Sequence, residues 1–147
     1  MDEVKRPPQA TTAMMAVVVA SAFLVVSAFD GINSSHSIAT QEALAKAIDD
    51  PVFKQVGFTA AHFALLIRAA WMVTAASAAA SFVLAWYIPQ RHHAARIALA
   101  LTAFPAIAMI PFTGSLIALL LGFGAGLLWT QPMREWYSAK PVDRASP

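Results

Sequence analysis

The chain has 147 residues, of which 59% are hydrophobic and only 12% are charged, and its formal net charge is +2. Soluble domains carry about 25% charged residues, so the composition argues against an ordinary soluble fold, and the small charge argues against a nucleic-acid partner. Because the chain has no cysteine, disulfides, thiolate catalysis, iron–sulfur clusters and cysteine-ligated zinc are excluded.

Four apolar segments divide the chain, at 13–29, 69–88, 97–110 and 114–130. Each is about as long as the hydrocarbon core of a bilayer is thick, and backbone polar groups in hydrocarbon must be satisfied within the segment itself. We therefore expect an all-α polytopic membrane protein, with one domain over residues 1–147 built from four transmembrane helices.

The basic residues predict the orientation of this bundle. Lys5 and Arg6 precede the first segment, Arg91 and Arg96 lie between the second and third, and further basic residues follow the fourth. Four crossings place these three regions on one side of the membrane and the long segment 30–68 on the other. Because basic loops stay in the cytoplasm, we expect both termini and the tail 131–147 to be cytoplasmic, in a plasma or inner membrane.

The third and fourth segments are expected to be separate helices. One helix over 97–130 would be about 51 Å long, against a hydrocarbon core of about 30 Å. Pro111 and Gly114 interrupt the run and predict a tight hairpin at 111–114. Pro105 removes a hydrogen bond and is expected to kink the third helix.

The first segment has an alternative interpretation. Two basic residues, an apolar run and the small residues Val26-Ser27-Ala28 also fit a signal peptide with its cleavage site. Cleavage after Ala28 would leave three spans.

The outer segment 30–68 is expected to hold short helical pieces. The pattern at 41–49 predicts an amphipathic helix, and Asp50-Pro51 is typical of the start of a second one, which would bend at Gly57 and continue into the membrane. Two interpretations stay open: a cap that rests on the membrane surface, or a docking surface for a partner protein.

Arg68 is a possible functional residue because it borders a predicted span. Trp86 and Tyr87 mark the inner interface, and the segment 69–88 already crosses about 30 Å. Arg68 then lies at the outer interface, where its long side chain can reach water. The alternative is a deeper Arg68 that pairs with an anionic ligand or a carboxylate, for which Asp30 is the nearest candidate.

Small residues recur at every fourth position of the last segment, namely Gly114, Ala118, Gly122, Gly126 and Thr130. Small side chains let helices approach closely in lipid, so this stripe predicts a close helix contact, either within the chain or with a partner.

No catalytic, metal-binding or cofactor-binding set is predicted. All histidines and all acidic residues lie outside the predicted spans. A haem between helices would need histidines at matched depth, and a proton-coupled transporter normally places acids within its helices. We therefore expect no cofactor and no enzymatic activity.

The layout resembles small four-span membrane proteins of actinobacterial type, whose functions are uncharacterised. The resemblance rests on Arg91, on Ala95-Arg96 before the third helix, and on the closing stretch Leu128-Trp129-Thr130-Gln131-Pro132-Met133-Arg134-Glu135-Trp136. It implies a four-helix bundle and transfers no site residues.

Two functions stay open. The first is a non-enzymatic accessory subunit or assembly and scaffold factor of a membrane complex, whose partners are the lipid bilayer and either another membrane protein or further copies of this chain. The alternative is a component of a small-solute or lipid transporter, with Arg68 at an anion or headgroup site.

Overall fold

A computed structural model describes residues 6–34, 37–49, 57 and 59–138. These residues form helices and no strand, so the predicted all-α class is confirmed for this part of the chain. The elements are α1 (Pro8–Ser34), α2 (Ile38–Ile48), α4 (Ala60–Ala85), the short 3-10 helix η1 (Ile88–Gln90), α5 (His93–Ala108), α6 (Ile110–Thr113), α7 (Ile117–Leu127) and α8 (Gln131–Ser138).

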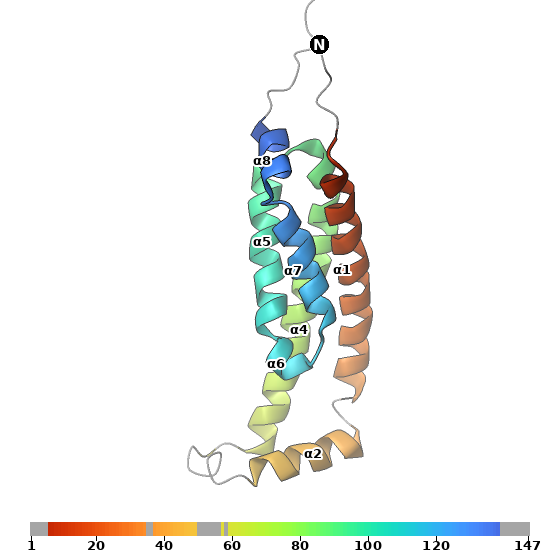
Figure 1. Cartoon of the computed structure of the whole chain (residues 1–147). Helices are drawn as coiled ribbons and strands as arrows, with labels where there is room; N and C mark the ends of the chain where they lie inside the picture. The colour runs from red at the N-terminus through yellow and green to blue at the C-terminus, as the bar shows by residue number, and fades with distance from the viewer. Residues whose placement is uncertain (1–5, 35–36, 50–56, 58, 139–147) are drawn as a thin grey trace, which may run out of the picture.

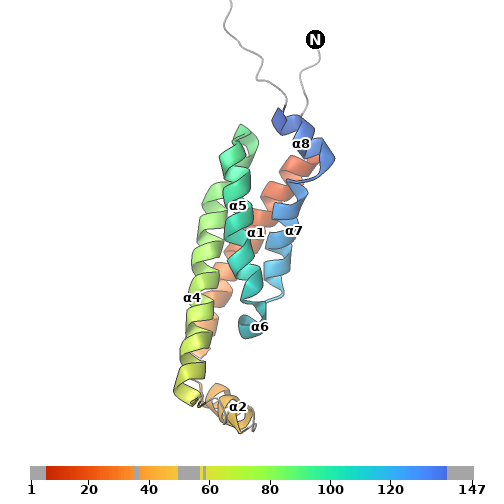
Figure 2. The same cartoon turned by 90° about the vertical axis from the view of Figure 1, so that its left-hand side faces the viewer.

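Four helices lie side by side along one long axis and make an up-down-up-down bundle (Figures 1 and 2). α1 packs against α4 and α7, and α5 packs against the same two helices, so the four close a ring. We call the end where α1 begins and α8 lies the α8 end. α2 lies across the opposite end, which we call the α2 end (Figure 1).

Two helices, α1 and α4, are long and apolar enough to cross a membrane. The predicted segment 13–29 lies inside α1, and most of 69–88 lies inside α4. α5 and α7 are shorter, with 16 and 11 residues. Both ends of α7 are extended by tight turns, in which Ala118 N donates to Ser115 O and Thr130 N to Leu127 O.

Local capping residues explain where the helices near the α2 end begin. Ser37 accepts a hydrogen bond from Thr40 N, which is the N-cap arrangement, so the helix predicted at 41–49 begins earlier, at Ile38. Thr59 and His62 form a capping box that starts α4. The helix start predicted at Asp50-Pro51 lies outside the described residues.

The predicted hairpin between the third and fourth segments is built from a helical turn. α6 follows α5 almost directly, and the chain reverses after Gly114, whose φ of +65° lies in the left-handed region that glycine adopts without strain. Pro105 lies inside α5, which continues past it to Ala108.

The bundle interior is filled mainly by small side chains. α4 buries one face that consists only of alanine, serine and threonine: Ala70, Thr74, Ser77, Ala78, Ser81 and Ala85. α7 approaches α1 closely at Gly124, where an added Cβ would lie 3.3 Å from Ala13 O. Such contacts bring backbones together and gain dispersion energy without large side chains.

Candidate functional site

The two charged residues singled out in the sequence, Arg68 and Asp30, are both exposed. Arg68 lies on α4 and Asp30 near the end of α1, toward the α2 end of the bundle. The structure records no ion pair between them and no hydrogen bond from either side chain to another described residue. Within the described residues, Arg68 therefore has no ion pair with Asp30, while its depth in a membrane stays a prediction.

Within the described chain, the residues of the predicted small-residue stripe do not share one buried face. Gly114 lies outside α7, Ala118 is fully buried, and Gly122 faces Ile107 of α5. Gly126 is exposed and Thr130 is half-buried in the turn after α7. Four residues turn an α-helix through about 400°, so each step moves the side chain about 40° around the axis. The glycine that touches α1 is Gly124 instead.

A cluster of arginine and aromatic side chains lies at the α8 end, where the sequence predicted no site. α8 carries Met133, Trp136 and Tyr137 on one buried face, at helical spacing, and turns its other residues outward. This face covers η1 and the start of α5, both of which contribute an arginine to the cluster. The part of the predicted tail at 131–138 is thus a helix packed on the bundle.

Arg96 is the buried charge of this cluster. The sequence placed it in the basic loop before the third helix, but it lies within α5 and is only 8% exposed. Its guanidinium carbon is 3.9 Å from the centre of the Trp129 ring and 5.7 Å from that of Tyr137. Its buried Nε has no hydrogen-bond partner among the described residues.

Tyr137 connects α8 to the 3-10 helix. Its hydroxyl donates a hydrogen bond of 3.2 Å to Ile88 O, and its ring lies 5.6 Å from that of His93. Burial raises the pKa of Tyr137 above its usual value, and the nearby positive charge of Arg96 offsets part of this increase. The phenol is therefore neutral at physiological pH and acts as a hydrogen-bond donor.

Arg91 and Trp136 form the second cation–aromatic pair of the cluster. The guanidinium carbon of Arg91 is 4.7 Å from the centre of the Trp136 ring, which is itself buried. Arg91 is the one described non-glycine residue with a positive φ, at 59°, where it ends η1. Such backbone geometry costs about 1 kcal/mol, so the surrounding contacts must hold it in place.

A groove between α5 and α7 leads into this cluster. It encloses about 260 Å³, and its walls include Ala103, Ile107, Gly122 and Gly126, with Trp129 at the α8 end. Trp129 therefore belongs to both features, since Arg96 lies over its ring. The groove is almost entirely apolar, whereas the end at Trp129 carries a positive charge.

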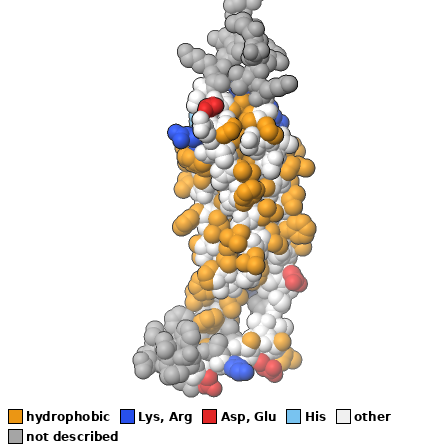
Figure 3. Space-filling model, in the orientation of Figure 1, with side chains coloured by type: hydrophobic (Ala, Val, Ile, Leu, Met, Phe, Trp, Pro, Cys, Tyr) orange, Lys and Arg blue, Asp and Glu red, His pale blue; other side chains and the backbone are white. Residues whose placement is uncertain are grey.

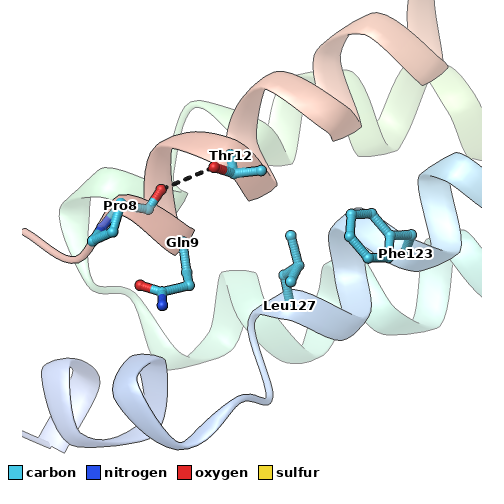
Figure 4. A pocket seen from close by; sticks show the side chains of 5 residues that line it. All are labelled: Pro8, Gln9, Thr12, Phe123 and Leu127. Atoms are coloured by element: carbon cyan, nitrogen blue, oxygen red, sulfur yellow. Dashed lines mark hydrogen bonds between the residues drawn. The ribbon is translucent and has the colours of Figure 1, made fainter.

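A second pocket lies between the start of α1 and α7 (Figure 4). Its walls are Pro8, Gln9, Thr12, Phe123 and Leu127, and Thr12 Oγ1 donates to Pro8 O at 3.1 Å. Gln9 Oε1 is buried without a hydrogen-bond partner. None of these residues is ionisable, so this pocket offers neither acid–base chemistry nor charge recognition.

The arginine–aromatic cluster places two positive charges among aromatic rings at the α8 end. It combines guanidinium groups, aromatic rings and one phenol hydroxyl. Among residues 6–34, 37–49, 57 and 59–138, no group of three or more histidine and acidic side chains could hold a metal ion. Comparisons of the chain with models of known protein families, with curated proteins and with solved structures gave no match in any of the three.

Proposed function

We propose that the chain is a four-span integral membrane protein of the plasma or inner membrane, with both termini in the cytoplasm. On the face seen in Figure 3, hydrophobic side chains cover the shaft of the bundle and charged side chains lie toward its two ends. α5 and α6 together run from His93 to Thr113, which is about 30 Å of helix and matches the thickness of a hydrocarbon core.

The helical turns around α7 support the fourth crossing. They continue from Ser115 to Thr130, about 24 Å, and follow α1 and α5 along the same axis. The basic residues Arg6, Arg91 and Arg134 gather at the α8 end, which agrees with a cytoplasmic position for that end.

Within the membrane, we propose that the protein is a non-enzymatic accessory subunit or assembly factor that binds a partner helix along α4. The observation that carries this proposal is a window of exposed alanines, Ala76, Ala79 and Ala80, on the outward face of α4. Large exposed side chains border it, with Val73 on one side and Val83 on the other. A second transmembrane helix can approach closely over small residues and gain packing contacts that lipid tails do not match.

The test is the mass of the native assembly in mild detergent. We expect the wild-type chain to run in a complex heavier than its 15.7 kDa monomer with bound detergent, and Ala76→Leu with Ala80→Leu to dissociate it. Ala22→Leu on the exposed face of α1 is the matched control and should leave the complex intact. A monodisperse wild-type monomer would reject the proposal, and the mass of the partner distinguishes a second copy from another protein.

The alternative function, a transporter component with Arg68 at its anion site, has weaker support. Arg68 is exposed toward the α2 end, whereas the arginine that is buried beside a groove is Arg96. Replacement of Arg68 by Gln tests the alternative directly, because a transporter of this kind would lose anion uptake and an accessory subunit would keep its complex.

A further inference from the structure

We propose that the groove between α5 and α7 binds one anionic phospholipid, with its phosphate at Arg96 and one acyl chain along the groove. This site is separate from the alanine window of α4. Four observations support it: the burial of Arg96, the charge around it, the apolar groove beside it, and its place at the end of the bundle.

The burial of Arg96 creates a need for an anion. Arg96 is only 8% exposed. The structure records no hydrogen bond or ion pair between its side chain and another described residue. A buried charge without a counter-charge is costly. The guanidinium carbon lies over the Trp129 ring, and no hydrogen bond between described residues uses the guanidinium N–H groups, which phosphate oxygens can accept.

The charges that face this place favour an anion. The rings beside Arg96 also carry Arg91 and His93, because Arg91 lies over Trp136, Trp136 packs on Tyr137, and His93 lies 5.6 Å from Tyr137. The one described carboxylate at this end, Glu135, accepts a hydrogen bond from Gln131 Nε2 at 3.0 Å. α5 also begins here, and the positive end of its dipole adds to the field.

The apolar lining of the groove beside Arg96 favours a lipid over a soluble anion. Its floor contains Gly122 and Gly126, and a Cβ added at Gly126 would meet nothing within 4 Å. An extended acyl chain can therefore lie against the backbone of α7, between Ile107 and Trp129. In the proposed orientation Arg96 lies at the cytoplasmic headgroup level, where basic sites between transmembrane helices bind anionic lipids.

The experiment measures quenching of Trp129 fluorescence in the full chain, reconstituted in phosphatidylcholine bilayers. The probes are phosphatidylglycerol and phosphatidylcholine with brominated acyl chains, and the Trp129→Phe variant gives the signal of the other three tryptophans. We expect brominated phosphatidylglycerol to quench at about tenfold lower mole fraction than brominated phosphatidylcholine, as a charge-assisted contact would give. Equal quenching by the two lipids would overturn the proposal.

Two variants separate the headgroup contact from the chain contact. Arg96→Gln should abolish the preference for phosphatidylglycerol, while Arg134→Gln, an exposed arginine at the same end, should keep it. Gly126→Leu adds a side chain to the groove at a position where a Cβ would meet nothing within 4 Å, and should reduce quenching by both lipids. If Arg96→Gln does not fold, the Gly126→Leu variant still tests the proposal. Unchanged quenching in Gly126→Leu would show that no acyl chain lies in the groove.

Inorganic phosphate distinguishes a lipid site from a soluble-anion site. Added to the wild-type chain, it should leave quenching by brominated phosphatidylglycerol unchanged, because a free anion gains nothing from the groove. Displacement of the lipid by phosphate would overturn the proposal. An equal loss of the preference for phosphatidylglycerol in Arg96→Gln and Arg134→Gln would also overturn it, because it would indicate an effect of surface charge alone.

Discussion

Ser81 of α4 and Thr102 of α5 are joined by a hydrogen bond of 2.9 Å between their hydroxyl oxygens. Thr102 Oγ1 also donates to Leu99 O at 3.1 Å, so Ser81 is the donor of the shared bond. Ser81 is fully buried, and the bond joins α4 to α5 inside the bundle. Ser21 of α1 is equally buried, but its hydroxyl has no hydrogen-bond partner among the described residues.

We predict that Ser81→Ala lowers the free energy of unfolding by about 0.6 kcal/mol, and by no more than about 1.7 kcal/mol, which is the range for hydrogen bonds between transmembrane helices. Ser21→Ala should leave stability unchanged or increase it, because the substitution removes a buried polar group that gains no bond. Unfolding of both variants in mixed detergent micelles checks the pair. A larger loss of stability in Ser21→Ala than in Ser81→Ala would contradict the finding that Ser81, and not Ser21, makes a hydrogen bond in the bundle interior.

The two glycines of α7 at 124 and 126 should respond oppositely to alanine. A Cβ at Gly124 would lie 2.8 Å from Val17 Cγ2 and 3.2 Å from Val17 N, so α1 and α7 must move apart. Overpacking of this kind costs about 1–3 kcal/mol. Gly126→Ala meets open space and should stabilise the helix by about 0.5–1 kcal/mol.

The same micelle unfolding measurement compares the two glycine variants. Because both changes add one methyl group to the same helix, each controls for the other. A stable Gly124→Ala chain would mean that α1 and α7 do not approach as closely as the structure shows.

Tyr137 should make the protein lose stability at alkaline pH. Burial raises its folded pKa above the value of about 10 for an unfolded chain, so the folded state holds the phenol proton more tightly. The resulting stability is complete below pH of about 10 and is lost as the pH rises through the folded pKa. Tyr87→Phe leaves one tyrosine, so tyrosinate absorbance then reports Tyr137 alone.

The contribution of Arg96 to this titration has a definite sign. Its positive charge lowers the pKa of Tyr137, so Arg96→Gln in the Tyr87→Phe background should move the titration to still higher pH. A shift to lower pH, or none, would show that the guanidinium does not face the phenol ring.

The bundle and its outer helix follow from patterns that a sequence shows directly. The apolar run at 13–29 is contained in α1, and the amphipathic helical pattern at 41–49 overlaps α2, since local residue patterns determine both helices. The first residue of α4 is harder to predict from the sequence, because it depends on the reciprocal hydrogen bonds of Thr59 and His62 rather than on hydropathy.

The arginine–aromatic cluster is not predicted from the sequence, because the charge of Arg96 suggests a position in the loop before α5. Within α5 it stands in register with Leu99, Ala103 and Ala106, so helical spacing already placed it on the buried face. Likewise Met133, Trp136 and Tyr137 mark an amphipathic turn in the predicted tail. Which aromatic ring Arg96 would meet could not be predicted, since that contact joins α5 to Trp129 in the turn after α7 and depends on the packing of the whole bundle.

The four-span topology predicts opposite accessibility for the two ends of the bundle. The chain has no cysteine, so single cysteines at Glu42 on α2 and Ser138 on α8, both exposed, are unambiguous reporters. In intact cells a membrane-impermeant thiol reagent should label Glu42→Cys and spare Ser138→Cys, because the basic residues near the α8 end predict a cytoplasmic position for that end. Permeabilised cells are the control, in which both positions should react. Labelling of both positions before permeabilisation would require an even number of crossings between them, and would remove Arg96 from the cytoplasmic headgroup level on which the lipid site depends.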